Sequence, residues 1–281
     1  FIELLFYLRR NYKRKIPKGY DDSSTPIHNK LLAGKDVDTP VGGGILLIII
    51  VFILSVAYAY LTDPERPTEL YIILFTFLSF GLIGFLDDIK KIFTAFSGKY
   101  VGLRSRYILL LQVVAATLIS LMLSYLIGLN NLYVPSLGNF LIGNWYIPLS
   151  AFVIVAFANA YNISDGLDGL STGLLTICLF AFLALASASL DLTLAAFIGI
   201  WIGALFSFLY FNVYPARIFL GDAGALAFGA TLAVIGLLSG KVLALAIIGG
   251  VYVIIVGSSL VQILSKRFLK RKVWPVAPIH M

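Results

Sequence analysis

Aspartates gather in a few short polar segments that separate long apolar stretches of this chain. The pair Asp87-Asp88 follows one apolar stretch, Asp165 and Asp168 lie between two others, and Asp222 precedes a further one. Carboxylates at a membrane boundary are costly unless a cation or solvent neutralises them, so they mark functional sites. Carboxylate oxygens, phosphate oxygens and water are the ligands that Mg²⁺ takes in proteins. We therefore interpret these aspartates as parts of one site that binds a metal ion.

The elements that must position these acids are predicted from composition. The chain has 281 residues, of which 60% are hydrophobic and 12% charged, and its mean hydropathy is +0.96. Soluble proteins are about 25% charged, and a helix needs about 20 apolar residues to cross a bilayer. The sequence predicts an all-α, polytopic membrane helical bundle with about eight complete spans. The apolar stretches are residues 41–62, 70–86, 107–129, 145–162, 170–190, 194–211, 222–238 and 242–264.

Lysine and arginine are distributed very unequally between the two sets of loops. Of the 21 Lys and Arg residues, only Arg66 and Lys241 fall in one set, and the other 19 fall in the set that holds the acids. The positive-inside rule places the second set in the cytoplasm. We expect a multi-pass protein of the cell membrane whose site faces the cytoplasm. We expect residues 1–281 to form a single integral-membrane domain, with cytoplasmic loops at about 9–40, 87–106, 162–170, 212–222 and 265–281.

The Asp87-Asp88 pair is expected at the C-terminal end of a helix. The helix dipole disfavours acids at that end, which makes their placement informative. A solvated helix end balanced by Lys90 and Lys91 would also explain the pair. The alternative is a role in binding Mg²⁺ or in general-base chemistry.

The segment after residue 159 combines acids with glycines in a single turn between two spans. Asp165 and Asp168 are three residues apart, so they share a face if this segment is helical. Gly166 and Gly169 permit unusual backbone angles and can offer their N–H groups to an anion or a base. A simple turn needs only one glycine and no paired acids, so we interpret this segment as functional.

Three other segments support weaker interpretations. Asp222 precedes a span, where an acid is favourable for helix capping alone, and Phe219 could anchor the loop in lipid or stack on a base. Thr39-Pro40 is expected to start a helix, followed by glycines that let neighbouring helices approach closely or, alternatively, let the backbone approach a ligand. Residues 130–145 contain no charge and predict a short amphipathic hairpin on the outer surface.

Taken together, the motifs resemble the polyprenyl-phosphate N-acetylhexosamine-1-phosphate transferases, and among them the phospho-MurNAc-pentapeptide translocases. They occur in the order and at the spacing typical of that family. The Pro-Ile-His ending favours the second group over relatives that use GlcNAc-phosphate. The matching stretches are Thr39-Pro40 with Gly43-Gly44, Asp87-Asp88 with Lys91, Gly102-Leu103 with Leu110-Leu111-Gln112, Asn159 to Leu170, Tyr214 to Gly224, and Ala277-Pro278-Ile279-His280.

The resemblance implies a specific reaction. The chain would transfer phospho-MurNAc-pentapeptide from UDP-MurNAc-pentapeptide to undecaprenyl phosphate in the lipid bilayer, giving lipid I and UMP for peptidoglycan synthesis. It also implies Mg²⁺ as the cofactor and leaves a homodimer open. Nucleic acid is excluded as a partner because no soluble basic domain is present to bind it.

Roles for individual residues follow from the same resemblance. Asp222 would bind the metal, Asp87 would act as base or nucleophile, and Asp88 would assist beside them. His280 would contact the sugar-phosphate side and complete the catalytic group. The residues expected to bind nucleotide or substrate are Lys35, Lys91, Asn162, Asp165, Gly166, Leu167, Asp168, Asn212, Phe219 and Gln262.

The sequence also departs from the family pattern. The family has ten spans, so most of the first and all of the tenth are expected outside this sequence. Val41-Gly42 stands where Thr-Met is usual, and Ile108 stands where a lysine is usual. These differences leave the accepted UDP-sugar open. A sister transferase that uses UDP-GlcNAc and a membrane transporter are the alternative functions.

Overall fold

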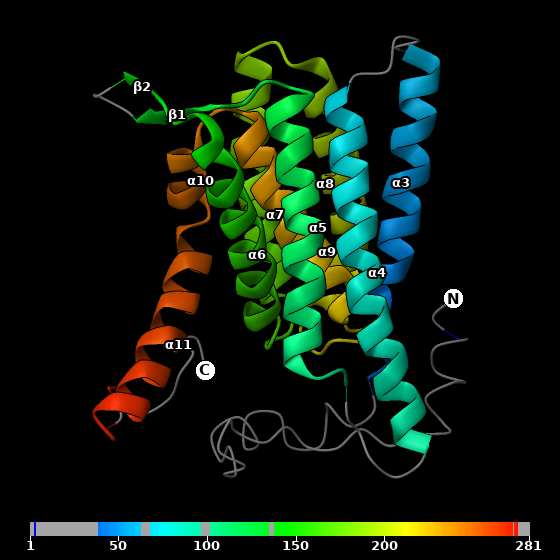
Figure 1. Ribbon diagram of the computed structural model, residues 1–281. Helices are drawn as coiled ribbons and strands as arrows, with labels where there is room; N and C mark the ends of the chain where they lie inside the picture. The colour runs from blue at the N-terminus through cyan, green and yellow to red at the C-terminus, as the bar shows by residue number, and fades with distance from the viewer. Residues whose placement is uncertain are drawn as a thin grey trace.

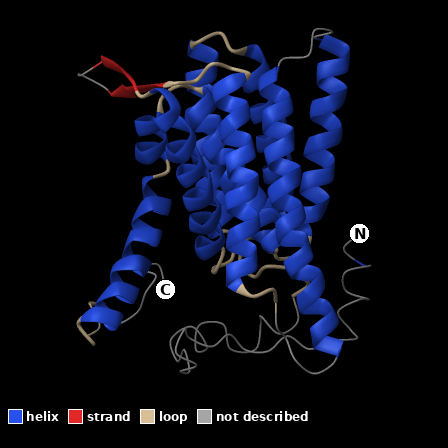
Figure 2. Cartoon of the chain, viewed as in Figure 1, coloured by secondary structure: helices blue, strands red, loops and turns tan. Residues whose placement is uncertain are grey.

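The computed structural model describes residue 3 and residues 39–62, 68–96, 102–134, 138–271 and 273–274. Most of these residues are helical, as Figures 1 and 2 show. The elements are α3 (Gly43–Thr62), α4 (Thr68–Phe96), α5 (Ser105–Tyr125), β1 (Asn131–Val134), β2 (Gly138–Leu141), a 3₁₀ turn (Gly143–Trp145), α6 (Tyr146–Ser164), α7 (Leu170–Ala188), α8 (Leu192–Asn212), α9 (Asp222–Leu238), α10 (Val242–Ile248) and α11 (Gly250–Phe268).

The helices confirm the expected all-α, polytopic membrane bundle. Within the described ranges, seven helices are long and apolar enough to cross a membrane, and α9 is an apolar helix of 17 residues. The apolar stretch predicted at 242–264 is divided at Gly249 into α10 and α11. From α3 to α9 successive helices run in opposite directions, and α10 and α11 together run opposite to α9, so alternate connections meet at the same end of the bundle (Figure 1).

Helix α9 forms the centre of the bundle. Every residue from Ala223 to Leu237 is buried, and the helix packs mainly against α4 and α6. A helix that is hydrophobic on all sides can be buried on all sides. Several of its residues are Gly or Ala, and these small residues permit the close helix contacts typical of membrane proteins.

Glycines bring α3 and α4 against the beginning of α9. A Cβ atom on Gly44 would collide with the backbone of Gly224, and one on Gly84 would collide with the backbone of Asp222 and Ala223. The interpretation of the glycines after Pro40 as close-packing residues is therefore confirmed for Gly44. The contact of Gly84 with Asp222 holds Asp222 beside the part of α4 that carries the paired acids.

The end of α4 differs from the expectation. The apolar stretch ends at residue 86, but the helix continues to Phe96, so the interpretation of Asp87-Asp88 as a helix C-terminus is wrong. No Gly or Pro occurs between residue 86 and Gly98, so nothing in this segment breaks the helix. An ion pair between Asp87 and Lys91, one turn apart, also supports the helix where it leaves the apolar layer.

The start of α3 also differs. Thr39 and Pro40 do not cap this helix, which begins at Gly43. Instead, Val41 forms a parallel bridge with Phe219, and the Thr39 hydroxyl donates a hydrogen bond to the Ala216 carbonyl at 3.2 Å. Long-range bonds to the segment before α9 hold these residues extended, which a local capping pattern does not reveal.

The 130–145 segment forms the hairpin that its composition predicted. Strands β1 and β2 pair antiparallel, with Asn131 opposite Leu141 and Val134 opposite Gly138. The hairpin lies at the end of the bundle away from Asp222 (Figure 1).

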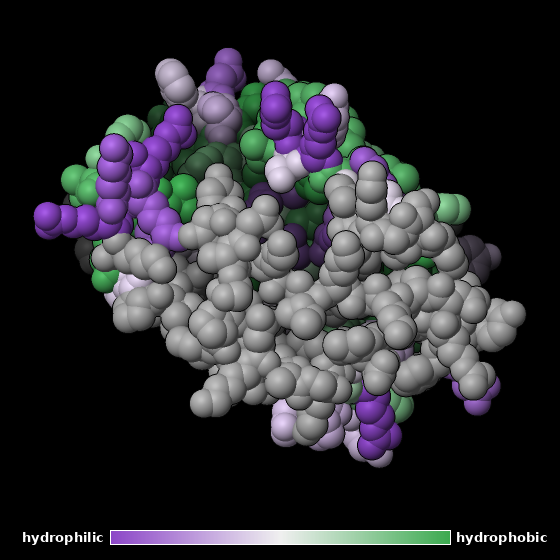
Figure 3. All heavy atoms as spheres, turned by 90° about the horizontal axis from the view of Figure 1, so that it is seen from below, coloured by the Kyte–Doolittle hydropathy of each residue, from purple (hydrophilic) through white to green (hydrophobic). Residues whose placement is uncertain are grey.

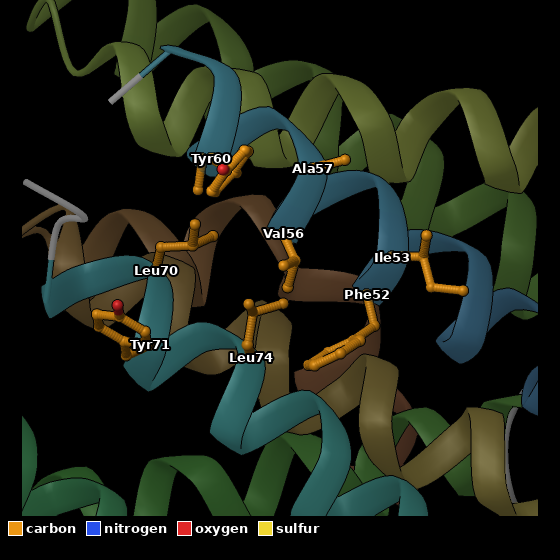
Figure 4. Close-up of a pocket in the computed structure, with 9 residues that line it drawn as sticks. Phe52, Ile53, Val56, Ala57, Tyr60, Leu70, Tyr71 and Leu74 are labelled. Carbon is orange, nitrogen blue, oxygen red and sulfur yellow. The ribbon is translucent and has the colours of Figure 1, made fainter. Parts of the chain in front are cut away.

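An apolar cavity of about 430 Å³ lies between α3 and α4 on the half of these helices away from the acids. Figure 4 shows Val56 and Leu74 facing one another across it, with Tyr60 and Tyr71 near its end. Its lining is almost wholly apolar, so this cavity offers no chemistry and belongs to the lipid-facing side of the helix pair.

The glycine contact at the start of α9 leads to a testable expectation. Gly44→Ala should lower the free energy of unfolding by about 1–3 kcal/mol, the usual cost of overpacking a core. Gly199 in α8 has open space around it, so Gly199→Ala is the matched control and should melt close to the wild type. Thermal unfolding in detergent measures both. Equal melting temperatures for the two variants would contradict the close contact.

Candidate active site

Two carboxylates from different helices pair with one ammonium group, and a third carboxylate lies beside them. Helix α4 contributes Asp87, Asp88 and Lys91, and Asp222 stands at the first position of α9. Lys91 Nζ lies 2.7 Å from Asp87 Oδ2 and also pairs with Asp222 Oδ2. Asp88 Oδ2 accepts a hydrogen bond from the Ala223 N–H at 3.1 Å. The ammonium therefore offsets repulsion between acids that the fold forces together.

Asp87 is the most enclosed member of this group. It is only 3% exposed, and its Oδ1 accepts a hydrogen bond from the Leu103 N–H at 2.5 Å. The preceding residue, Gly102, lies so close that a Cβ atom there would collide with the Asp87 carboxylate. The loop before α5 thus closes over Asp87 and fixes its orientation.

Asp222 and Lys91 form the accessible side of the cluster. Their side chains are 25% and 23% exposed. Figure 3 shows this end of the molecule, where polar side chains stand around a recess near the middle. A charged ligand can therefore reach Asp222 and Lys91, while Asp87 lies deeper.

A second polar group is organised by Asn212 at the end of α8. This side chain is 2% exposed. Its Oδ1 accepts hydrogen bonds from the Gly169 N–H and the Thr172 hydroxyl, both at 3.2 Å, and its Nδ2 donates to the Ile218 carbonyl at 3.0 Å. Asn212 thus joins the turn after α6 to the segment before α9. Gly169 has φ +72°, a left-handed conformation that glycine adopts without strain.

Asp165 and Asp168 point to different partners. Helix α6 ends at Ser164, so the two acids lie in a turn and their expected shared helical face does not form. Asp165 Oδ1 accepts a hydrogen bond from the Ser171 hydroxyl at 2.5 Å. Asp168 Oδ2 accepts one from the Ala216 N–H at 2.9 Å. Both acids tie the turn to its surroundings, and Asp168 reaches the segment that contains Phe219.

Phe219 is fixed through its backbone. Its N–H donates to the Pro40 carbonyl at 2.9 Å, and its carbonyl accepts hydrogen bonds from Gly42 and Gly43 at 3.1 and 3.0 Å. The side chain is partly exposed. This places an aromatic ring three residues before Asp222 on a well-held segment.

The other predicted residues fall in three places. Asn162, Gly166 and Leu167 are half-buried at the end of α6 and in the turn that follows. Gln262 in α11 accepts hydrogen bonds from the Val273 and Trp274 N–H groups and donates one to the Trp274 carbonyl, so it fastens the chain after α11. Lys35 and His280 lie outside the described residues.

The structure adds backbone groups that sequence reasoning missed. The N–H groups of Leu103 and Ala223 bind Asp87 and Asp88 directly. The Gly102-Leu103 pair was visible in the sequence, but no pattern connected it with Asp87. A glycine before the basic residues of that loop was the available signal, because close backbone approach requires one.

The carboxylates at this end of the bundle can be compared with the ligands that a metal ion requires. Among the described residues, no three His, Cys, Asp or Glu side chains converge as a metal cage. Mg²⁺, however, usually binds only one or two protein carboxylates and completes its shell with phosphate oxygens and water. Asp222 is a partly exposed oxygen donor with further carboxylates beside it, so these residues fit such a shared site.

A helical membrane bundle with an acid cluster at one end defines a class of integral-membrane protein with a polar reaction or binding site at the membrane face. The model of glycosyl transferase family 4 matches residues 70–240. The chain also resembles proteins named phospho-N-acetylmuramoyl-pentapeptide-transferase. The one from Caldanaerobacter subterraneus subsp. tengcongensis is 35% identical over 247 residues, which cover 88% of this chain and 75% of that protein.

Two further relatives with the same name agree. Those from Oceanobacillus iheyensis and Bacillus subtilis are 35% and 32% identical, again over 88% of this chain and 75% of theirs. The chain belongs to the phospho-N-acetylmuramoyl-pentapeptide-transferase group of glycosyl transferase family 4. The family resemblance expected from the sequence motifs is confirmed.

The central ammonium group can be tested by its removal. In Lys91→Gln, Asp87 and Asp222 would face each other without a cation. Charged hydrogen bonds contribute about 1.5–3 kcal/mol each, so the melting temperature should fall. Lys90→Gln changes the neighbouring residue on α4 and should melt close to the wild type. A Lys90 variant that loses as much stability as the Lys91 variant would show that the effect is general charge loss.

Proposed function

We propose that this chain transfers phospho-MurNAc-pentapeptide from UDP-MurNAc-pentapeptide to undecaprenyl phosphate, giving lipid I and UMP in peptidoglycan synthesis. The names of its relatives describe this transferase activity. The structural observation that supports it most is the Lys91 ammonium between Asp87 of α4 and Asp222 of α9. Such a site can bind phosphate groups with cations and position their attack with carboxylates.

The reaction needs alignment and charge neutralisation more than covalent work. An oxygen of the acceptor phosphate forms a bond to the β-phosphorus of the donor, and the bond from that phosphorus to UMP breaks. The Lys91 side chain is 23% exposed, so it can contact a phosphate oxygen while it keeps its ion pair with Asp87. The acids hold Lys91 in place, so its charge is already oriented when the phosphates arrive.

Asp87 is proposed to act on the acceptor phosphate. It is enclosed, and Leu103 and Lys91 fix both of its oxygens. A carboxylate held in this way can take a proton from the acceptor or orient it. In a two-step route it would instead attack the β-phosphorus of the donor and release UMP, and the acceptor phosphate would then displace the carboxylate from that phosphorus. Both routes use the same geometry, and Asp88 supports either one by holding the start of α9.

Asp222, with Asp88 or Asp87 beside it, is proposed to hold Mg²⁺ together with the donor's diphosphate. When bound, the ion would supply positive charge that stabilises the leaving UMP. The chain's contribution is the position of Asp222, which Gly84 and Gly44 set by their contacts at the start of α9.

The uridine is proposed to lie along the turn after α6 and the segment before α9. Asp168 fixes the Ala216 N–H with one oxygen, and a carboxylate can accept further hydrogen bonds, such as one from the uracil N3–H. The Phe219 side chain can stack on the uracil ring. Three backbone hydrogen bonds fix the position of this residue. Gly166, Leu167 and Asn162 shape the same region, and Asp165 braces the turn.

The surroundings of the acids suit an acceptor with an apolar chain. A cavity of about 280 Å³ between α3 and α4 reaches Ala223, next to Asp222. It is lined almost entirely by apolar side chains such as Ile48, Leu78 and Phe85. The excess of Lys and Arg in the loops at this end supports a cytoplasmic orientation in the cell membrane.

UMP release tests the proposal. Purified protein with undecaprenyl phosphate and Mg²⁺ should release UMP from UDP-MurNAc-pentapeptide, and Asp222→Asn should lower the rate by at least about 10²–10³-fold, as for loss of a group that stabilises transition-state charge. Asp191→Asn is the matched control. Asp191 also stands at a helix start, where it accepts the Leu194 N–H, and asparagine caps a helix equally well.

The same assay separates the alternatives. Faster UMP release from UDP-GlcNAc than from UDP-MurNAc-pentapeptide would assign the chain to a sister transferase. Solute uptake into proteoliposomes without nucleotide consumption would indicate a transporter. If no UDP-sugar released UMP, the proposed function would be wrong.

A further inference from the structure

The β1–β2 hairpin lies at the end of the bundle opposite the acid cluster. Figures 1 and 2 show it extending sideways beyond α6. Strand β1 contacts α10, the short helix that precedes α11. The hairpin therefore projects over the side of the bundle near the level at which the helices end.

The two faces of this hairpin differ in chemistry. Residues directly opposite one another on paired strands share a face, and successive residues alternate between faces. The register places Leu132 opposite Phe140 and Tyr133 opposite Asn139. One face of the described strands thus carries Leu132, Val134 and Phe140, and the other carries Asn131, Tyr133, Asn139 and Leu141. The first face is wholly apolar, and the second combines amides with a phenol and a leucine.

Large side chains around the hairpin are widely exposed. Leu141 is 81% exposed, Trp145 78% and Tyr125, at the end of α5, 71%. Burial of apolar side chains of this size away from water is strongly favourable. Several large apolar and aromatic side chains exposed at one end of the molecule are therefore expected to be covered.

Charge shows what kind of environment covers it. From Tyr107 to Ser164, through two spans and the connection between them, there is no Asp, Glu, Lys or Arg. A surface that faces water is typically about 25–35% charged. Tyr and Trp, in contrast, are enriched where a membrane meets water, because their rings are apolar and their polar groups can reach headgroups.

We propose that the β1–β2 hairpin and Trp145 are an interfacial anchor, embedded at the boundary of headgroups and acyl chains in the leaflet opposite the acid cluster. The exposed Tyr125 ends α5, and the exposed Trp145 directly precedes α6. The lipid-covered surface of these two spans therefore extends onto the hairpin. The amides of Asn131 and Asn139 face the headgroups. Through β1 the anchor holds α10 at a fixed depth, just before the chain turns at Gly249 into α11.

Spin-label accessibility tests this anchor. Cys178 is the chain's only cysteine and is buried, so a Cys178→Ala background permits single labels at Phe140→Cys, on the apolar face of the hairpin, and at Lys241→Cys and Val114→Cys. Lys241 lies at the same end of the bundle and is exposed, and Val114 is an exposed residue within the α5 span. Collision rates with oxygen and with a water-soluble nickel chelate are measured in phosphatidylcholine–phosphatidylglycerol vesicles.

The anchor predicts an intermediate depth for the label at Phe140, which shares the apolar face with Leu132. Its collisions with nickel should be several-fold fewer than at Lys241, and its collisions with oxygen should approach those at Val114. Nickel collisions equal to those at Lys241 would place the hairpin in water. Low collision rates with both reagents would mean that protein, such as a second copy of this chain, covers the hairpin. Either result would overturn the proposal.

Discussion

The site depends on one ammonium group that lies between carboxylates of two helices. Lys91 pairs with Asp87 on its own helix and with Asp222 on α9, while Asp88 accepts the N–H of the residue after Asp222. Three acids in so small a space repel one another strongly where the dielectric is low. The lysine makes the arrangement tolerable and leaves part of its charge, with Asp222, accessible to a ligand.

The cluster also requires that α4 and α9 approach closely. Because the hydrophobic effect does not drive helices together in lipid, membrane helices associate through close packing. Small residues meet that requirement here, because Gly84 touches the first turn of α9 and Gly44 touches Gly224. The stacked ring contact between Phe77 and Phe228 joins the same two helices further along. Structural glycines and aromatics thus determine where the reactive carboxylates lie.

Much of this arrangement could be predicted from sequence. Apolar length fixes the spans, and their alternation brings Asp87, Asp165 and Asp222 to one end without any knowledge of packing. The uncharged 130–145 segment correctly indicated a hairpin. Predictions from local sequence patterns were wrong where a distant segment forms hydrogen bonds with the residues concerned. Thr39 bonds to Ala216 instead of capping α3, because the extended segment beside Phe219 offers it a partner.

The partners of individual side chains were also out of reach of sequence. The spacing of Asp165 and Asp168 suggested a shared helical face, but α6 ends one residue earlier and each acid meets a different donor. Gln262 was expected to contact substrate, whereas in the structure its amide bonds to the backbone of residues 273 and 274. Its role toward substrate stays a prediction. Hydrogen-bond partners depend on which loops lie beside a residue in the folded chain. The spacing of residues in the sequence does not show this.

The central claim is that the acid cluster holds the diphosphate of a uridine-linked donor. A structure of the protein with a bound UDP-sugar would test it most directly. We expect the diphosphate in contact with Lys91 and Asp222, and the uracil beside Asp168 and Phe219. A nucleotide bound at the hairpin end, or with its phosphates away from Lys91 and Asp222, would contradict the account.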